Sequence, residues 1–342
     1  MLSLIYQYYF FDIPNFFIHL SPQKSKSIEM KDIIAPVDKH LILMELTPER
    51  FIRKTNRSNN ELYVVTAHDS PNVMREIGRL RELSFRYAGG GTGLEIDIDH
   101  YDTAGNPYKQ LIVWDSESEE ILGGYRFHIC DESYVNDAGE INLATAELFT
   151  FSSGFIRDYL PYTIELGRSF VQPAFQSTNR FGKGIYSLDN LWDGLGALVV
   201  ENPDKKYFLG KVTMYTSYNT EARNMILYFL DKHFGDKERL IYPFEDVALK
   251  IEMDTDAMAK LFTGKNYDDD YKILFQTVRS YGENIPPLIN SYMNLSPSMK
   301  TFGTAINAHF GGVEETGLMI TINDLYSEKV KRHITSYIAN EK

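Results

Sequence analysis

The feature that most constrains the fold is an alternation of strand and helix signals that begins after Met30. A β-rich run over residues 61–66 precedes the dipeptide Ser70-Pro71, which is typical of a helix start. The apolar residues that follow recur at helical spacing: Val73, Ile77, Leu80 and Leu83. This part of the chain therefore predicts a strand followed by an amphipathic helix.

The alternation continues to residue 234. Two apolar runs, at 110–115 and 121–130, flank a polar stretch and predict a β-hairpin. The pattern then predicts strands over 162–171 and 207–216, and helices over 186–200 and 220–234. The order β-α-β-β-β-α-β-α favours an α/β fold with a mixed central sheet flanked by helices.

Composition narrows the class of protein. The 342 residues include 43% apolar side chains, which is enough for a large buried core. The net charge of −12 gives no overall basic surface, so we expect no nucleic-acid partner. The single cysteine, Cys130, cannot form an intrachain disulfide and fits a reducing compartment, which favours a cytoplasmic location.

Ionisable side chains interrupt three stretches, 81–102, 123–126 and 164–171, where an α/β protein would normally place apolar residues. The third is a predicted strand that carries Glu165 and Arg168. A charged group in such surroundings is costly unless it is paired, and charged pairs held in a cleft are candidate sites. A purely structural ion pair between Glu165 and Arg168 is the alternative interpretation.

Taken in order, these stretches resemble the Gcn5-related acyltransferase fold, and within it the hemolysin-like N-acyltransferases that begin ornithine-lipid and glycine-lipid synthesis. Acyl-homoserine-lactone synthases are more distant relatives. The resemblance covers roughly residues 45–235 and rests on four motifs: Arg81-Glu82-Leu83-Ser84-Phe85-Arg86, Asp97-Ile98-Asp99-His100-Tyr101-Asp102, Gly123-Gly124-Tyr125-Arg126 and Glu165-Leu166-Gly167-Arg168. Residues 285–292 and 317–322 look like the family's proline-led helix and its last strand.

The resemblance divides the chain into three parts. Residues 30–245 would form the acyltransferase core, and residues 246–342 would add a helical insertion that packs on the sheet and a last strand that completes the domain. Residues 1–29 are apolar and aromatic but match neither a secretory signal nor a membrane-spanning helix. We interpret them as an extension outside the functional protein; an anchor for peripheral contact with the inner membrane is the alternative.

The resemblance implies chemistry in which an amine attacks a thioester, so the amine must lose a proton and the developing oxyanion must be stabilised. By similarity Glu165 would be the base, directly or through water, while Arg126 and Arg168 would organise the carboxylates and a substrate carboxylate. Calcium-loop spacing is absent, so we expect no metal site. The acceptor pocket would instead be shaped by ion pairs that also include Arg81, Arg86, Asp97, Asp99 and Asp102.

A glycine-containing segment lies where this fold carries its pyrophosphate loop: Asn179-Arg180-Phe181-Gly182-Lys183-Gly184. Gly182 and Gly184 would let backbone amides approach a phosphate, and Arg180 and Lys183 would add positive charge. Asn179 replaces the usual Gln or Arg, which favours an acyl-carrier-protein thioester over acyl-coenzyme A as co-substrate, with no tightly bound cofactor. An ordinary glycine-rich turn is the alternative.

We therefore expect an N-acyltransferase that moves a fatty or 3-hydroxyfatty acyl group from acyl carrier protein to the α-amine of glycine or ornithine. This reaction is the first step of amino-acid lipid synthesis. One alternative is an acyl-homoserine-lactone-type synthase, although the 246–296 insertion and Pro286-Pro287 match the lipid-forming branch better. The other is a non-catalytic protein that binds lipid or membrane.

Overall fold

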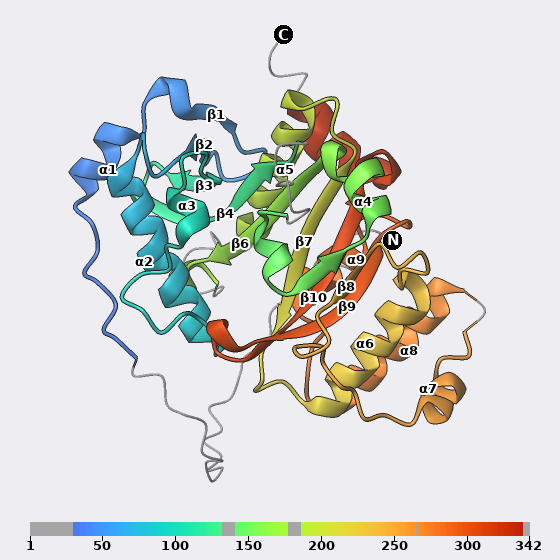
Figure 1. Ribbon diagram of the computed structural model, residues 1–342. Helices are drawn as coiled ribbons and strands as arrows, with labels where there is room; N and C mark the ends of the chain where they lie inside the picture. The colour runs from blue at the N-terminus through green and yellow to red at the C-terminus, as the bar shows by residue number, and fades with distance from the viewer. Residues whose placement is uncertain (1–29, 132–140, 177–185, 265, 338–342) are drawn as a thin grey trace.

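A mixed β-sheet forms the centre of the protein. The computed structural model describes residues 30–131, 141–176, 186–264 and 266–337, so the 1–29 extension lies outside it. Within these residues the sheet has eight strands in the order β1-β2-β3-β4-β6-β7-β10-β9 (Figure 1). They are β1 (Phe51–Lys54), β2 (Glu61–Val65), β3 (Lys109–Asp115), β4 (Glu120–Ile129), β6 (Thr163–Val171), β7 (Tyr207–Met214), β9 (Lys300–Asn307) and β10 (Val313–Thr321).

The predicted mixed sheet is confirmed, because β6 and β7 pair in parallel while the other neighbouring strands pair antiparallel. A separate small sheet joins β5 (Phe149–Phe151) to β8 (Ile241–Pro243). Leu111 and Ile112 show how the large sheet is buried on both sides. These neighbours on β3 belong to different hydrophobic cores, since successive strand residues point to opposite faces.

Helices cover both faces of the sheet (Figure 1). The helix α2 (Pro71–Ala88) shares a core with Ile112, whereas α5 (Ser187–Glu201) and α6 (Thr220–Phe234) share a core with Leu111. As predicted, α2 begins at Pro71; it ends where Gly89 adopts a left-handed φ of 98°. The remaining helices are α1 (Lys39–Glu45), α3 (His100–Thr103), α4 (Ser153–Asp158), α7 (Thr255–Leu261), α8 (Tyr267–Ser280), α9 (Pro287–Met293) and α10 (Ser327–Lys329).

The C-terminal part differs from the expectation in two ways. The insertion helix α8 packs on α6, so it covers a helix that itself covers the sheet (Figure 1). The edge strand β9 gave no clear sequence signal, because Gly303 interrupts its run of strand-forming residues. In the structure Gly303 has a left-handed φ of 83°. No helix in the described ranges is both long enough and apolar enough to cross a membrane.

Candidate active site

The charged residues singled out in the sequence gather on the α2 side of the sheet. On β4, Arg126 and His128 alternate with Phe127, which lies in the core on the opposite face. We call the group formed by Arg81, Arg126, Arg168, Asp97, Asp99 and Asp102 the arginine–carboxylate network. It joins α2, α3 and the loop before α3 to β4 and β6, and its three guanidinium groups balance its three carboxylates.

Arg81 anchors the network beneath α2. Its side chain is fully buried, and its Nη1 donates to Asp102 Oδ2 at 3.0 Å, while Nη2 donates to Gln110. Gln110 Nε2 in turn donates to Asp102 Oδ1 at 3.0 Å. Burial acts to raise the pKa of Asp102, but the guanidinium groups of Arg81 and Arg126 outweigh it and lower this pKa to about 2.

Arg126 links α3 to the sheet. Its Nη1 lies 2.7 Å from both carboxylate oxygens of Asp99 and 3.3 Å from Asp102 Oδ2. The same two aspartates form the capping box that starts α3, so the short helix is built around the arginine's partners. Burial disfavours the guanidinium charge, yet these carboxylates raise the pKa of Arg126 above its ordinary value.

Arg168 lies at an irregularity in β6. Arg126 pairs with Gly167 and Gly124 pairs with Phe170, so β6 carries one extra residue and bulges there. Arg168 has a left-handed φ of 51°, which is uncommon for a residue with a side chain. Its Nε lies 2.9 Å from Asp97 Oδ2 and its guanidinium carbon 4.4 Å from the ring centroid of Phe310. Burial raises the pKa of Asp97 despite this pairing.

The expectation that Arg86 helps to neutralise these aspartates is wrong. Its Nε donates to Glu82 at 2.7 Å, and its Nη1 donates to the carbonyl of Lys31, also at 2.7 Å. Glu82 is buried and also accepts from the backbone N–H groups of Thr92 and Gly93. Arg86 and Glu82 therefore fix the glycine-rich loop after α2, away from the arginine–carboxylate network.

Glu165 has a different environment from the aspartates. Its Oε1 accepts from the backbone N–H of Thr145 at 2.7 Å, and its Oε2 accepts from the hydroxyl of Tyr108. Burial, reinforced by Glu165, raises the pKa of that hydroxyl. The alternative of a Glu165–Arg168 ion pair is thus wrong, since Arg168 pairs with Asp97 and Asp99. Among the described residues, Glu165 has no cationic partner within salt-bridge distance.

Sequence reasoning missed several residues around Glu165. Tyr108 and Thr145 hold its two oxygens, and Lys211 on β7 forms an ion pair of 3.0 Å with Glu315 on β10. A lysine inside a predicted strand is the same kind of signal that marked Glu165, so Lys211 could have been selected. Tyr108 and Thr145 gave no such signal, because tyrosine and threonine are ordinary residues in and around strands.

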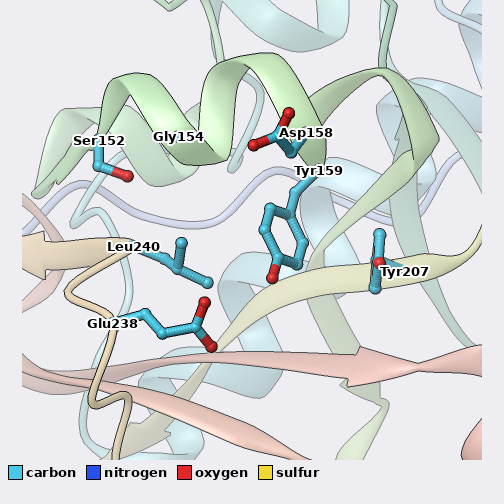
Figure 2. Close-up of a pocket in the computed structure, with 7 residues that line it drawn as sticks. All are labelled: Ser152, Gly154, Asp158, Tyr159, Tyr207, Glu238 and Leu240. Carbon is cyan, nitrogen blue, oxygen red and sulfur yellow. The ribbon is translucent and has the colours of Figure 1, made fainter.

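The expected donor loop, Asn179, Arg180, Gly182, Lys183 and Gly184, lies outside the described residues. A pocket of about 540 Å³ lies between α4 and the start of β7 (Figure 2). No residue of the network lines this pocket; it is lined by Ser152, Gly154, Asp158, Tyr159, Tyr207, Glu238 and Leu240.

Replacing Arg81 with methionine is expected to destabilise the fold by about 3–5 kcal/mol, because Asp102 would keep its burial and lose a charged partner. The free energy of unfolding from urea titration measures this loss. Arg157→Met is the control, since Arg157 is exposed and its ion-pair partner among the described residues is the exposed Asp158; its unfolding midpoint should match wild type. Equal stability of the Arg81 variant and wild type would contradict the structural role of this pair.

Comparison with known proteins places the chain in a family. A model described as an acetyltransferase (GNAT) domain matches residues 80–182, which include the whole arginine–carboxylate network and Glu165. A protein named glycine N(alpha)-acyltransferase from Phocaeicola vulgatus is 56% identical over 309 residues, covering 90% of this chain and 94% of the relative. A protein of the same name from Bacteroides thetaiotaomicron is 55% identical over 309 residues, covering 90% and 91%. These matches overturn the alternative of a non-catalytic lipid-binding protein. The chain belongs to the GNAT acyltransferase family and is an N-acyltransferase.

Proposed function

We propose that this enzyme transfers a fatty acyl group from acyl carrier protein to the α-amine of glycine, as the first step of amino-acid lipid synthesis. The names of the two relatives support glycine over ornithine, and acylation of an amino acid over lactone synthesis. The observation that carries the chemistry is the environment of Glu165. This buried carboxylate is held by two hydrogen bonds but is not paired with any described cation, as a proton acceptor requires.

The position of Glu165 also suits this role. The parallel pairing of β6 with β7 runs from Thr163 opposite Tyr207 to Glu165 opposite Leu209 and then stops. Backbone groups beyond this point are no longer paired between the two strands, so the extended arm of a thioester donor would lie there. The thioester carbonyl would then be next to Glu165.

The reaction would proceed in three steps: loss of a proton from the amine, acyl transfer, and protonation of the leaving thiolate. Glu165 would accept one proton from the ammonium group of glycine, directly or through a water molecule. The amine nitrogen would then bond to the thioester carbonyl carbon while the carbon–sulfur bond breaks. The second proton would pass from the nitrogen to the leaving thiolate, which gives an amide and a free thiol.

Arg168 is the arginine best placed to bind the carboxylate of glycine. Arg81 and Arg126 are buried within the network, and Arg86 is occupied by Glu82 and backbone carbonyls. The side chain of Arg168 is 18% exposed, and its Nη1 has no hydrogen-bond partner among the described residues. Its Nη1 can therefore donate to a substrate carboxylate while its Nε keeps the bond to Asp97.

Two unpartnered polar atoms add support for a polar ligand at this site. Thr145 Oγ1 and Arg126 Nε are both buried and make no hydrogen bond to any described residue. Thr145 binds Glu165 through its backbone, and Arg126 Nε lies 3.5 Å from where a side chain on Gly167 would begin. Because buried polar groups are usually satisfied, we infer that substrate or water occupies the space over Gly167.

We assign the donor to acyl carrier protein because Asn179 replaces the usual Gln or Arg of the loop, while the charges of Arg180 and Lys183 and the backbone amides would contact the phosphopantetheine phosphate. A carrier-protein donor, together with the single cysteine, supports reaction in the cytoplasm. The fatty product would then partition to the inner membrane.

The purified enzyme should convert isotope-labelled glycine and acyl carrier-protein thioester into N-acylglycine, detected by mass spectrometry. Acyl-coenzyme A of the same chain length should be a much weaker donor, and ornithine a much weaker acceptor. Equal rates with the two donors would contradict the carrier-protein assignment. Preferential acylation of ornithine would contradict the acceptor assignment while leaving the N-acyltransferase activity intact.

A further inference from the structure

We propose that Lys211 is a positioning residue that holds Glu165 in place through the turn at Ala144 and Thr145; this inference rests on the proposed role of Glu165. Lys211 lies on β7, and only 14% of its side chain is exposed. Its ammonium group makes two contacts. Nζ lies 3.0 Å from Glu315 Oε2 and donates to the carbonyl of Ala144 at 3.2 Å.

The turn that accepts from Lys211 also carries the groups that hold Glu165. The backbone N–H of Ala144 donates to the hydroxyl oxygen of Tyr108 at 3.1 Å, and that hydroxyl donates to Glu165 Oε2. The backbone N–H of Thr145 donates to Glu165 Oε1 at 2.7 Å. Hydrogen bonds, joined through the backbone of residues 144 and 145, thus connect Lys211 on β7 to both oxygens of Glu165 on β6.

The turn is anchored on one side by packing, because Leu143, Ala144 and Leu148 are buried and the carbonyl of Leu143 accepts from the hydroxyl of Tyr101 at 3.1 Å. It opens a single 3-10 turn (Ala144–Glu147) whose N-cap, Leu143, provides no side-chain hydrogen bond. Its exact placement over the sheet therefore depends on this packing together with contacts from neighbouring strands. Lys211 supplies such a contact from the strand next to the one that carries Glu165.

The ion pair leaves Lys211 free to make this contact. Glu315 also accepts from Asn307 Nδ2 at 3.2 Å, so its charge is shared between two donors. A lysine has three N–H donors, and one of them is directed at Ala144. Replacing a buried ion pair with well-packed apolar residues is often neutral or stabilising, so stability alone does not explain the pair between Lys211 and Glu315. The contact of Lys211 with the Ala144 turn gives a functional reason for a lysine at this position.

The test removes the contact without leaving a lone buried charge. In the Lys211→Met/Glu315→Gln variant, the new side-chain amide at position 315 can still accept from Asn307 while the donor to Ala144 is lost. We expect kcat to fall by roughly 10- to 100-fold, the scale of an ångström-sized misplacement of a catalytic group. The KM for glycine should stay within about twofold of wild type, because a residue that acts only through Glu165 does not itself bind the acceptor. Lys211→Arg, which keeps a charged donor, should retain most of kcat.

Lys205 provides a matched control. Its side chain is 9% exposed, and its Nζ donates to the carbonyls of Cys130 at 3.2 Å and Pro161 at 2.9 Å. Like Lys211 it holds backbone carbonyls, but it does not contact the turn at Ala144. Lys205→Met should therefore leave kcat unchanged, even if it lowers the melting temperature.

A double-mutant cycle with Glu165→Gln separates positioning from general destabilisation. If Lys211 acts through Glu165, adding the Lys211/Glu315 changes to Glu165→Gln should cause no further fall in kcat. Multiplied losses, or wild-type kcat in the Lys211/Glu315 variant, would overturn the inference and leave Glu165 as the base. Full activity of Glu165→Gln would overturn the base assignment and this inference together. If the double substitution does not fold, Lys211→Gln enters the same cycle with the same expectations.

Discussion

Glu165→Gln is expected to lower acyl transfer by roughly 100-fold or more while the protein stays folded, which is the usual scale for loss of a general base. Glutamine has the same shape as glutamate but cannot accept a proton from the amine. Its amide can keep a hydrogen bond to each neighbour, although the hydroxyl proton of Tyr108 loses its acceptor, which should lower the free energy of unfolding by about 1–3 kcal/mol. The amide oxygen would accept from the backbone N–H of Thr145, and the amide nitrogen would donate to the hydroxyl of Tyr108, since a tyrosine hydroxyl can also accept.

Steady-state kcat with glycine measures the effect, and circular dichroism with a thermal melt confirms the fold. Glu76→Gln is a suitable control, because Glu76 is also buried and also accepts from a backbone N–H, that of Val37 at 3.0 Å. It lies outside the network and should keep wild-type turnover. A folded Glu165 variant with wild-type turnover would remove Glu165 from the mechanism.

The sequence predicted the grouping of the charged residues better than it predicted their partners. Buried arginines and aspartates must find one another, because an unpaired charge in a core is too costly. Whether an arginine joins the network depends on the direction in which its side chain leaves its helix or strand. Arg81 and Arg86 are five residues apart on α2, so their side chains point about 140° apart around the helix axis. Glu82 and Arg86 have the i,i+4 spacing that allows a pair on one helix face, and the structure contains this pair, which the sequence analysis overlooked.

The geometry of β6 could not be read from the sequence. In a regular strand, residues three apart face opposite sides, which would separate Glu165 from Arg168. The bulge opposite Arg126 adds one residue and lets Arg168 reach Asp97 on the loop before α3. Gly167 is compatible with a bulge but is not sufficient to predict one. The contact between Thr145 and Glu165 could not be predicted either. The two residues are 20 positions apart, and the path of the chain between them decides whether the Thr145 backbone meets Glu165.

Glycine is expected to be acylated roughly 30- to 1000-fold faster than methylamine under identical donor conditions. Methylamine lacks the carboxylate, so it loses a charge-assisted contact with Arg168 that we expect to contribute about 2–4 kcal/mol to the transition state. Arg168 can provide this contact because its Nη1 has no partner in the described part of the chain and its side chain is partly exposed. The comparison of kcat/KM for the two amines measures the effect directly.

Changing Arg168 alone would leave Asp97 buried without its partner, so the decisive variant is Arg168→Gln/Asp97→Asn, which neutralises both side chains. In this variant kcat/KM for glycine should fall toward the value for methylamine, while the methylamine value should stay close to that of wild type. Loss of both activities in equal proportion would assign Arg168 a structural role instead. Comparable rates for glycine and methylamine in the wild-type enzyme would rule out carboxylate recognition altogether, and other primary amines would then become the acceptors to test.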